Sequence, residues 1–416
     1  MVKKAFFFLR HNNDIDHITP VLHKWLSNEE IETHIIICDN KKYLEDYRIK
    51  YLKKFKNAKI YFISHLFEKY GWKGKFYKKI YDLILYIRSN FYRHWLLRKF
   101  LFSNKILRIL DKDIFLGIDE GIVVFDWTAN RFRHKIVKLA KKHGLVTISL
   151  PHGDEPSINY MIYNKDLKYD FSKRDYSRFK VYDYVVVPNQ LIKKKRYLSF
   201  DQNKIKVLGS ARFSDEWLDF IPKIRPTFNL DYGKDKVKIL LFLRPPSFPI
   251  FWDEVARTIK LISKFPNTYL IVNHHPRGGG ALKELRNTRN ILNVRHVITE
   301  IPSENLMDWA DLIIDVGGTS AVWDPIKKGK PVLMPEYLHA NYDTVSSYIR
   351  ESEIKHRDEL YKFLIKFTDN KNLKFYKTDG REKFIKEIID VPDKNVLENY
   401  YAFLKDCLIE SSRKRK

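Results

Sequence analysis

The sequence contains few cysteines, and it lacks a long apolar run. Cys38 and Cys407 are the only cysteines in 416 residues, and they are far apart, without the spacing of metal ligands. This excludes a disulfide-stapled scaffold and a cysteine-based zinc site, and it favours a reducing, cytoplasmic setting. No apolar run approaches the ~20 residues that cross a bilayer. The apolar run at 5–9 is too short for a signal peptide, so we interpret it as a first strand.

Acidic residues are also scarce relative to basic ones. Lysine and arginine total 77 against 51 acidic residues, which gives a formal net charge of +26. An excess this large implies an anionic partner. Between 73 and 109 there are ten lysines or arginines and one acid, Asp82, interleaved with aromatic and aliphatic residues. We predict a basic amphipathic helical region over about 67–109 that contacts an anionic membrane surface. The alternative is a core-packed helical pair with a basic polar face.

Short apolar strands alternate with helical patterns along the whole chain, which is typical of doubly wound parallel sheets. The expected strands are 5–9, 33–38, 59–63, 121–125, 146–150, 184–187, 204–208, 237–243, 268–272, 294–298, 312–316 and 330–334. The expected helices are 18–26, 134–143, 190–198, 252–265 and 303–310, with Ser303 as a cap of the last.

We therefore predict the α/β class, with two Rossmann-like domains that face a cleft. The first domain is expected at 1–220 and binds the acceptor. A linker at 221–236 contains two prolines and a glycine without periodicity. The second domain, at 237–390, binds a nucleotide donor, and 391–416 forms a C-terminal helix and basic tail. The final helices, about 383–409, are expected to cross back onto the first domain.

The most informative segment joins the strand 312–316 to the strand 330–334. Gly317, Gly318, Thr319 and Ser320 follow the first strand directly. Glycines allow a ligand to approach the backbone, and unpaired N–H groups at a helix start favour an anion. We predict a phosphate-binding turn. The alternative is that Thr319 or Ser320 only caps a helix.

A histidine follows the predicted strand 146–150. His152 can abstract a proton from an acceptor hydroxyl, because a histidine pKa lies near neutrality. Asp154 or Glu155 is expected to orient it. The alternative is a histidine that hydrogen-bonds a loop backbone.

Basic side chains follow two strands of the second domain. His274, His275 and Arg277 come after the strand 268–272, and Arg244 comes after 237–243. Such groups can neutralise a leaving phosphate. Histidines with structural roles in loops are the alternative.

Acidic side chains mark further positions. Asp14, Asp16 and His17 follow the first strand and are candidates for a metal or an acceptor sugar; acids at a helix N-terminus are the alternative. Glu304 and Glu336 are candidates for recognising donor hydroxyls. Asp126, at the end of 121–125, is a weaker candidate for the acceptor side.

Three segments resemble bacterial GT-B-fold transferases of surface polysaccharide synthesis, and most of all the CDP-glycerol:polyglycerophosphate transferases of teichoic acid and capsule assembly. They are His152-Gly153, His275-Pro276, and 303–315 with its small-hydroxyl turn and Lys330-Pro331-Val332. The resemblance covers roughly 120–340 and implies that His152 is the base and that His275 meets the donor pyrophosphate. The family's double-serine turn is here Gly317-Gly318-Thr319-Ser320, which leaves the donor open.

The His-Pro and Ser/Thr turns are also similar to those of sialyl- and Kdo-transferases, which use CMP-sugars. Their acidic-acidic-Gly motif matches Asp119-Glu120-Gly121 in letters, but this tripeptide precedes a predicted strand instead of ending one.

The sequence thus predicts a peripheral enzyme on the inner face of the cell membrane. It would move a sugar or polyol-phosphate unit from a CDP- or CMP-linked donor to a growing surface glycan or a lipid-linked acceptor. No metal, other cofactor or nucleic acid is expected, because helix and side-chain charges can stabilise a departing phosphate. One rival is a non-hydrolysing UDP-sugar 2-epimerase. The other is a non-catalytic basic module that binds nucleic acid or anionic membrane.

Overall fold

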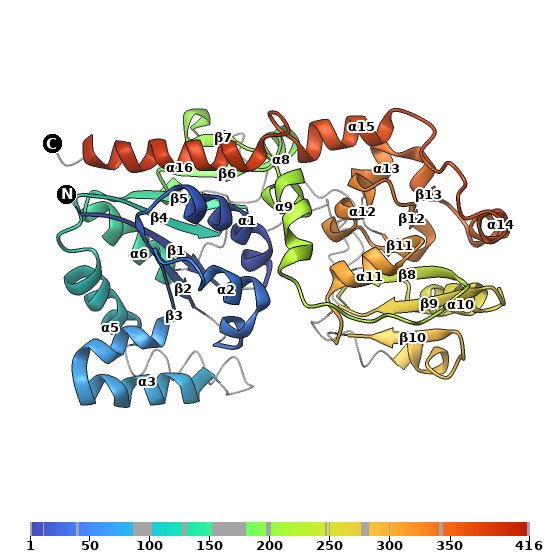
Figure 1. Ribbon diagram of the computed structural model, residues 1–416, viewed down its shortest axis with the longest axis horizontal. Coiled ribbons are helices and arrows are strands. Elements are labelled where there is room, and N and C mark those ends of the chain that lie inside the picture. Colours follow the sequence, from blue (N-terminus) through green and yellow to red (C-terminus); the bar gives the residue numbers. More distant parts are fainter. Residues whose placement is uncertain are drawn as a thin grey trace. The chain divides into compact units, whose positions relative to one another are not determined.

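The computed structural model describes most of the chain in two compact units (Figure 1). The described residues are 2–10, 12–38, 41–85, 102–126, 131–151, 180–196, 201–245, 248, 250–275, 283–298, 300–340 and 344–413. Among them, the first unit holds those in 2–151, 180–225 and 388–413, and the second holds those in 226–387. The division after residue 225 falls inside the segment 221–236.

The first unit is built on a seven-stranded parallel sheet with the order β3-β2-β1-β4-β5-β6-β7. Its strands are β1 (Lys3–Leu9), β2 (Glu32–Ile37), β3 (Ala58–Phe62), β4 (Glu120–Asp126), β5 (Val146–Leu150), β6 (Tyr184–Val187) and β7 (Ile205–Val207). The central strands are apolar and buried on both faces, as parallel strands covered by helices are.

Helices cover this sheet. They are α1 (Asn12–Asn28), α2 (Tyr47–Leu52), α3 (Gly71–Leu85), α5 (Phe102–Ile109), α6 (Arg131–Lys142), α8 (Gln190–Arg196), α9 (Asp215–Phe220) and α16 (Val396–Arg413). Shorter turns are η1 (Lys41–Glu45), η2 (Ile63–Tyr70), η3 (Leu110–Ile114), η6 (Gln202–Lys204), η7 (Ala211–Phe213) and η8 (Ile221–Lys223). The short segment η14 (Ile385–Ile389) contains the division between the two units, which falls after residue 387. Figure 1 shows α16 lying along the first unit, although it is the last helix of the chain.

The second unit is built on a six-stranded parallel sheet with the order β10-β9-β8-β11-β12-β13. Its strands are β8 (Val237–Leu243), β9 (Thr268–Asn273), β10 (Val294–Val297), β11 (Leu312–Val316), β12 (Val332–Pro335) and β13 (Glu353–Ile354). Its helices are α10 (Trp252–Ser263), α11 (Ser303–Trp309), α12 (Trp323–Lys327), α13 (Thr344–Tyr348), α14 (Arg357–Asp369) and α15 (Gly380–Phe384). Turns are η10 (Lys283–Thr288), η11 (Ser320–Val322), η12 (Glu336–Leu338) and η13 (Arg350–Ser352).

The predicted α/β class and the two Rossmann-like sheets are confirmed. Two element predictions are wrong. Helix α1 begins at Asn12 instead of residue 18, because Asp14 accepts a hydrogen bond from the Arg10 N–H (2.6 Å) and Ile15 is buried. The cap of α11 is Pro302, and Ser303 is its first helical residue, without a capping hydrogen bond.

No described helix is long and apolar enough to cross a membrane. Of the predicted basic amphipathic region, η2, α3 and α5 are described, whereas 86–101 lie outside the described residues.

Candidate functional site

The second sheet reverses its strand order between β8 and β11. The chain runs outward from β8 through β9 to β10, and then returns beside β8 to build β11, β12 and β13. In open α/β sheets, ligands bind outside the carboxyl ends of the strands at such a switch point. Arg244 directly follows β8, and Gly317 directly follows β11. Two of the predicted donor-binding groups therefore lie where the topology favours a ligand.

Arg244 contacts the glycine turn. Its Nε donates a hydrogen bond to the Gly317 carbonyl oxygen (3.1 Å), and its guanidinium stacks over the ring of Phe248 (4.4 Å to the centroid). Both contacts fix a group that stays protonated at any physiological pH. They place a permanent positive charge beside the turn, and this charge favours an anion there.

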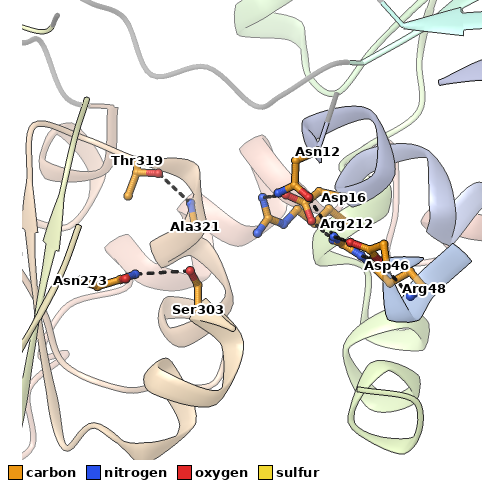
Figure 2. Close-up of polar contacts among 9 residues, drawn as sticks. All are labelled: Asn12, Asp16, Asp46, Arg48, Arg212, Asn273, Ser303, Thr319 and Ala321. Atoms are coloured by element: carbon orange, nitrogen blue, oxygen red, sulfur yellow. Dashed lines mark hydrogen bonds and ion pairs between the residues drawn. The ribbon is translucent and has the colours of Figure 1, made fainter. Parts of the chain in front are cut away.

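The turn itself needs its two glycines. Gly317 and Gly318 have φ values of +96° and +73°, a region that residues with a Cβ rarely adopt. Thr319 follows the glycines and is held by a buried side chain, because its N–H donates a hydrogen bond to Oδ2 of the fully buried Asp315 (2.7 Å). The Thr319 hydroxyl accepts from the Ala321 N–H (3.3 Å; Figure 2).

These contacts modify the predicted phosphate turn. Thr319 is the cap of η11, a role that the capping alternative gave to Thr319 or Ser320. Its amide, expected among the groups that face a phosphate, donates to Asp315 instead. The following helix is also shorter than predicted, since a three-residue η11 precedes a five-residue α12. The positive charge at this edge comes from Arg244 more than from a helix dipole. Ser320 begins η11 and is half-buried.

The two histidines after β9 have different environments. His274 is 1% exposed, and its Nε2 shares a hydrogen bond with Nδ1 of His296 (2.7 Å). Nε2 of His296 pairs in turn with the Thr288 hydroxyl (3.1 Å). Burial, with the neighbouring His274 as a further cause, lowers the pKa of His296 to about 4. His274 is therefore a buried histidine paired with the partly buried His296, as the structural alternative predicted, whereas His275 is half-buried. Arg277 lies outside the described residues.

Further polar residues lie on elements at this edge of the sheet. Asn273, the last residue of β9, donates from Nδ2 to Oγ of Ser303 (3.4 Å; Figure 2). Glu304 lies in the first turn of α11 and is half-buried, and Glu336 begins η12 directly after β12 and is exposed. The structure thus places both candidate glutamates after strands of the same sheet, on elements that leave its carboxyl edge.

The first sheet has its own switch point, between β1 and β4. Asp126 ends β4, and Arg133 of α6 forms an ion pair with its carboxylate. A second nitrogen of Arg133 lies 4.0 Å from Asp14. All three side chains are at least 95% buried. The edge therefore holds a buried acid–arginine–acid cluster. The alternative for Asp14 and Asp16, acids at a helix N-terminus, describes their position in α1.

Asp16 lies in a second charged network (Figure 2). One carboxylate oxygen pairs with Arg48, and the other lies 3.3 Å from Nη1 of Arg212. Arg48 is fixed by Asp46, which accepts from Nε and Nη2 at 2.8 Å each, and by Asn12 at 3.2 Å. Two guanidiniums hold Asp16 in place.

No group of three or more described His, Cys, Asp or Glu side chains is arranged to hold a metal ion. His152, Asp154 and Glu155 lie outside the described residues. Asp119 and Glu120 lie at the amino edge of the first sheet, where they contact Val2 N (2.8 Å) and Lys3 Nζ (2.7 Å). Asp119 thus precedes β4, and Glu120 and Gly121 begin it, so the tripeptide starts a strand instead of ending one, as the sequence indicated. It lies away from the carboxyl edge, where such sheets bind ligands.

Sequence reasoning missed Asp315 and Arg133. A signal for Asp315 exists, because an acid four residues before a threonine, with two glycines between, is typical of a carboxylate that closes a turn. No comparable local signal exists for Arg133, whose partners Asp14 and Asp126 come from other elements.

No family model matches the sequence, and no curated protein matches it. Many solved structures match the fold. A UDP-GlcNAc 2-epimerase from Neisseria meningitidis bound to UDP-GlcNAc has 12% identity over 98% of this chain and 100% of its own, with a TM-score of 0.59. A UDP-N-acetylglucosamine 2-epimerase from Rickettsia bellii has 13% identity (99% and 97% coverage, TM-score 0.59). A glycosyltransferase from Rickettsia africae has 15% identity (98% of both chains, TM-score 0.51). The likeness spans the chain and shows that it has a GT-B-like fold of two Rossmann-like domains.

Proposed function

We propose that the protein is a transferase that moves a sugar or polyol-phosphate unit from a nucleotide-activated donor to a surface glycan or lipid-linked acceptor. The donor nucleotide would bind at the carboxyl edge of the second sheet. The observation that supports this most is the contact between Arg244 and the carbonyl of Gly317 at the β8/β11 switch point. It joins a fixed cation to a glycine turn at the place where such sheets bind ligands.

In this proposal the departing phosphate is stabilised by Arg244, His275, Arg277 and the turn Gly317–Ser320, in which the Thr319 N–H stays bonded to Asp315. Hydrogen-bond donors and cations that are already in place stabilise most strongly the charge that develops on a leaving phosphate. Asp315 and Phe248 fix two of these groups before any ligand arrives. Glu304 and Glu336 would accept hydrogen bonds from donor hydroxyls. No metal is needed in this scheme.

On the acceptor side, we propose His152 as the general base and Asp154 as the group that orients it. Asp16 would bind acceptor hydroxyls beside the two guanidiniums that fix it. These assignments rest on the sequence pattern and on the place of Asp16 after β1.

For the donor we propose a CDP- or CMP-linked compound, following the resemblance of the His-Gly, His-Pro and small-hydroxyl turns to CDP-glycerol and CMP-sugar transferases. For the acceptor we propose a membrane-bound glycan at the inner face of the cell membrane. The net charge of +26 supports an anionic surface as the place where the enzyme works.

A second candidate function is a UDP-sugar 2-epimerase. The fold likeness to two such enzymes supports it, since one of them is bound to UDP-GlcNAc. An epimerase predicts preference for UDP and turnover without an acceptor. The transferase predicts a donor product only when an acceptor is added.

A thermal-shift panel with CDP, CMP, UDP, GDP and ADP at one ionic strength tests both candidates. A ligand at a hundred times its Kd stabilises the folded state enough to raise Tm by roughly 5–10 °C. We expect CDP or CMP to give the largest shift. A shift with UDP alone would favour the epimerase, and no shift with any nucleotide would contradict both and favour a binding module.

A matched pair of variants locates the response. Arg244→Gln removes the charge beside the glycine turn, and we expect it to abolish most of the nucleotide shift. Arg257→Gln removes an exposed arginine of α10 that pairs with Glu254 (2.9 Å), and we expect the shift to persist. Equal shifts in the two variants would place the nucleotide elsewhere.

A further inference from the structure

Helix α3 has two apolar faces, of which one packs inward. Tyr81 and Ile84 are 8% and 4% exposed and belong to the core of the first unit. Gly74 lies on the same face, where an added Cβ would come within 1.7 Å of the carbonyl oxygen of Phe67 in η2. This inner face holds α3 against the unit, and the opposite face is not needed for that packing.

The opposite face carries large apolar side chains that remain exposed. Trp72, Phe76 and Leu83 are 76%, 58% and 69% exposed. Their spacing of four and seven residues puts them in one line along the helix. We name these three residues the outer stripe. Figure 1 shows α3 at the lower margin of the first unit. An apolar stripe of this size on an exposed helix indicates an interaction surface.

The charges beside the outer stripe are almost all positive. Lys73, Lys75 and Lys79 are exposed, and Nζ of Lys73 lies 5.5 Å from the Trp72 ring centroid. The one acid in α3 is Asp82, which accepts from Ser64 Oγ (2.7 Å) and pairs with Lys41 (3.4 Å). Lys79 lies on the line itself, between Phe76 and Leu83, whereas Lys73 and Lys75 lie on its two sides. The helix therefore presents an apolar line with an excess of cations within and beside it.

Another exposed apolar pair among the described residues has a different charge pattern. On α14, Tyr361 and Ile365 are both 47% exposed and are also spaced by four residues. That helix carries charges of both signs, with Asp358 and Glu359 in its first turn and Lys362 and Lys366 further along. The combination of a Trp-Phe-Leu line with lysines is thus a property of α3, and α14 serves as its natural control.

We propose that the outer stripe and the lysines within and beside it bind the surface of an anionic lipid bilayer, with α3 lying in the plane of the interface. Tryptophan and phenylalanine enter the headgroup boundary, and lysines pair with anionic headgroups. A nucleic acid would leave Leu83 in water, and a second copy of this face would bring lysines against lysines. The inference deepens the proposed function. Only the biological reason for membrane binding, which is access to a membrane-bound acceptor, rests on that function.

Vesicle flotation without nucleotide tests the apolar part. The full chain is mixed with phosphatidylcholine vesicles or with vesicles of equal phosphatidylcholine and phosphatidylglycerol. We expect binding to the anionic vesicles only, and about tenfold or greater weakening in the triple variant Trp72→Ser, Phe76→Ser, Leu83→Ser. The matched control, Tyr361→Ser with Ile365→Ser on α14, should bind like the wild type.

A second pair tests the charges and does not depend on the folding of the triple variant. Lys75→Gln with Lys79→Gln should weaken partitioning by about fivefold for each lysine. Lys362→Gln with Lys366→Gln on α14 changes the net charge by the same amount and should have little effect. If both pairs weaken partitioning equally, the net charge of the protein alone would explain the effect, and the assignment of membrane binding to α3 would be overturned.

Three other outcomes would also overturn the proposal. The first is that the wild type does not bind anionic vesicles. The second is that the stripe variants bind as well as their controls. The third is that the wild type forms a dimer without binding vesicles and that the stripe variants lose this dimer. The nucleotide panel is done in solution without lipid. A failure of membrane binding with an intact nucleotide shift would thus contradict this inference and leave the proposed function standing.

Discussion

At the scale of single residues, Asp315 organises the glycine turn. Its carboxylate is fully buried in the last part of β11 and accepts the N–H of Thr319, four residues later. A buried charged acceptor makes a stronger hydrogen bond than a neutral one and holds its partner more rigidly. The shape of the turn, and hence its readiness for a ligand, depends on this one side chain.

We expect Asp315→Asn to weaken nucleotide binding by about tenfold and to cost about 1–3 kcal/mol of stability, because a neutral amide is a weaker acceptor in a buried site. The control is Asp311→Asn at the other end of β11, where Asp311 accepts the Lys238 N–H (2.9 Å). That variant should keep full nucleotide affinity. Calorimetric titration and denaturant unfolding measure both. Equal affinity in the two variants would refute a role for Asp315 in the turn.

The His274–His296 pair predicts a pH dependence of stability. Burial lowers the pKa of His296 to about 4, against about 6.5 in an unfolded chain. Between these values the unfolded state binds more protons, so the free energy of unfolding falls as the pH falls from about 6.5 to about 4. Because the ring is only partly buried, we expect a loss of about 1–2 kcal/mol over this window.

Denaturant unfolding at several pH values measures this slope. His296→Gln should flatten it between pH 6.5 and 4. The control His356→Gln changes a histidine that is 67% exposed and pairs with Glu359, and it should leave the slope as in the wild type. A slope that survives in His296→Gln would assign the acid sensitivity to another group.

At the scale of helices and strands, the sequence predicts most of the framework. Val146–Leu150 and Val237–Leu243 are found at the predicted residues, because a strand buried on both faces is a continuous apolar run bounded by polar residues. The beginning of α1 was not predictable in this way. Asn12–His17 is polar in sequence, yet Asp14 and His17 are buried through contacts with other elements.

The same limit applies to the candidate site. The sequence places Arg244 and Gly317 each directly after a strand, but it cannot tell His274 from His275. Their difference depends on His296, which lies 22 positions away from His274 and shares a hydrogen bond with it. For Asp16, the partners Arg48 and Arg212 are still more remote in sequence. Local patterns therefore find the edge of a sheet, whereas the role of each side chain there depends on distant partners.

The packing of α3 on η2 predicts the effect of one added methyl group. Gly74→Ala puts a Cβ within 1.7 Å of a backbone oxygen, which the helix can relieve only by moving away. We expect a loss of about 1–3 kcal/mol. Lys73→Ala, at an exposed neighbouring position, should stay within about 0.5 kcal/mol of the wild type. Denaturant unfolding compares the two, and equal stability would show that α3 is not held by this contact.

At the scale of the whole molecule, the two units have separate hydrophobic cores. Separate cores allow separate unfolding transitions. A ligand that binds one unit raises only the transition of that unit. In differential scanning calorimetry, we expect a nucleotide to raise one transition and to leave the other unchanged.

Removal of α16 should affect the other transition. Six apolar residues of α16 are buried in the first unit, each worth roughly 1.5–3 kcal/mol, so the loss approaches the whole stability of a domain, about 5–15 kcal/mol. We expect a chain that ends after Asp390 to lose the first unit's transition and to keep the nucleotide-sensitive one. A chain that lacks only 414–416 is the control. Two intact transitions without α16 would contradict this.

The place of α16 also determines when each half of the protein can mature on the ribosome. The helix packs beside β4, and its Ser411 hydroxyl accepts the Gly121 N–H (2.8 Å). None of these contacts can form before the ribosome has synthesised α16. At about 5–20 residues per second, β4 waits on the order of 10–60 seconds for its cover. The second unit, complete by residue 387, emerges earlier. The second unit can therefore complete its folding before the first. A chain that stalls before α16 is made exposes apolar surface of the first unit, and quality-control proteases degrade chains that expose such surface.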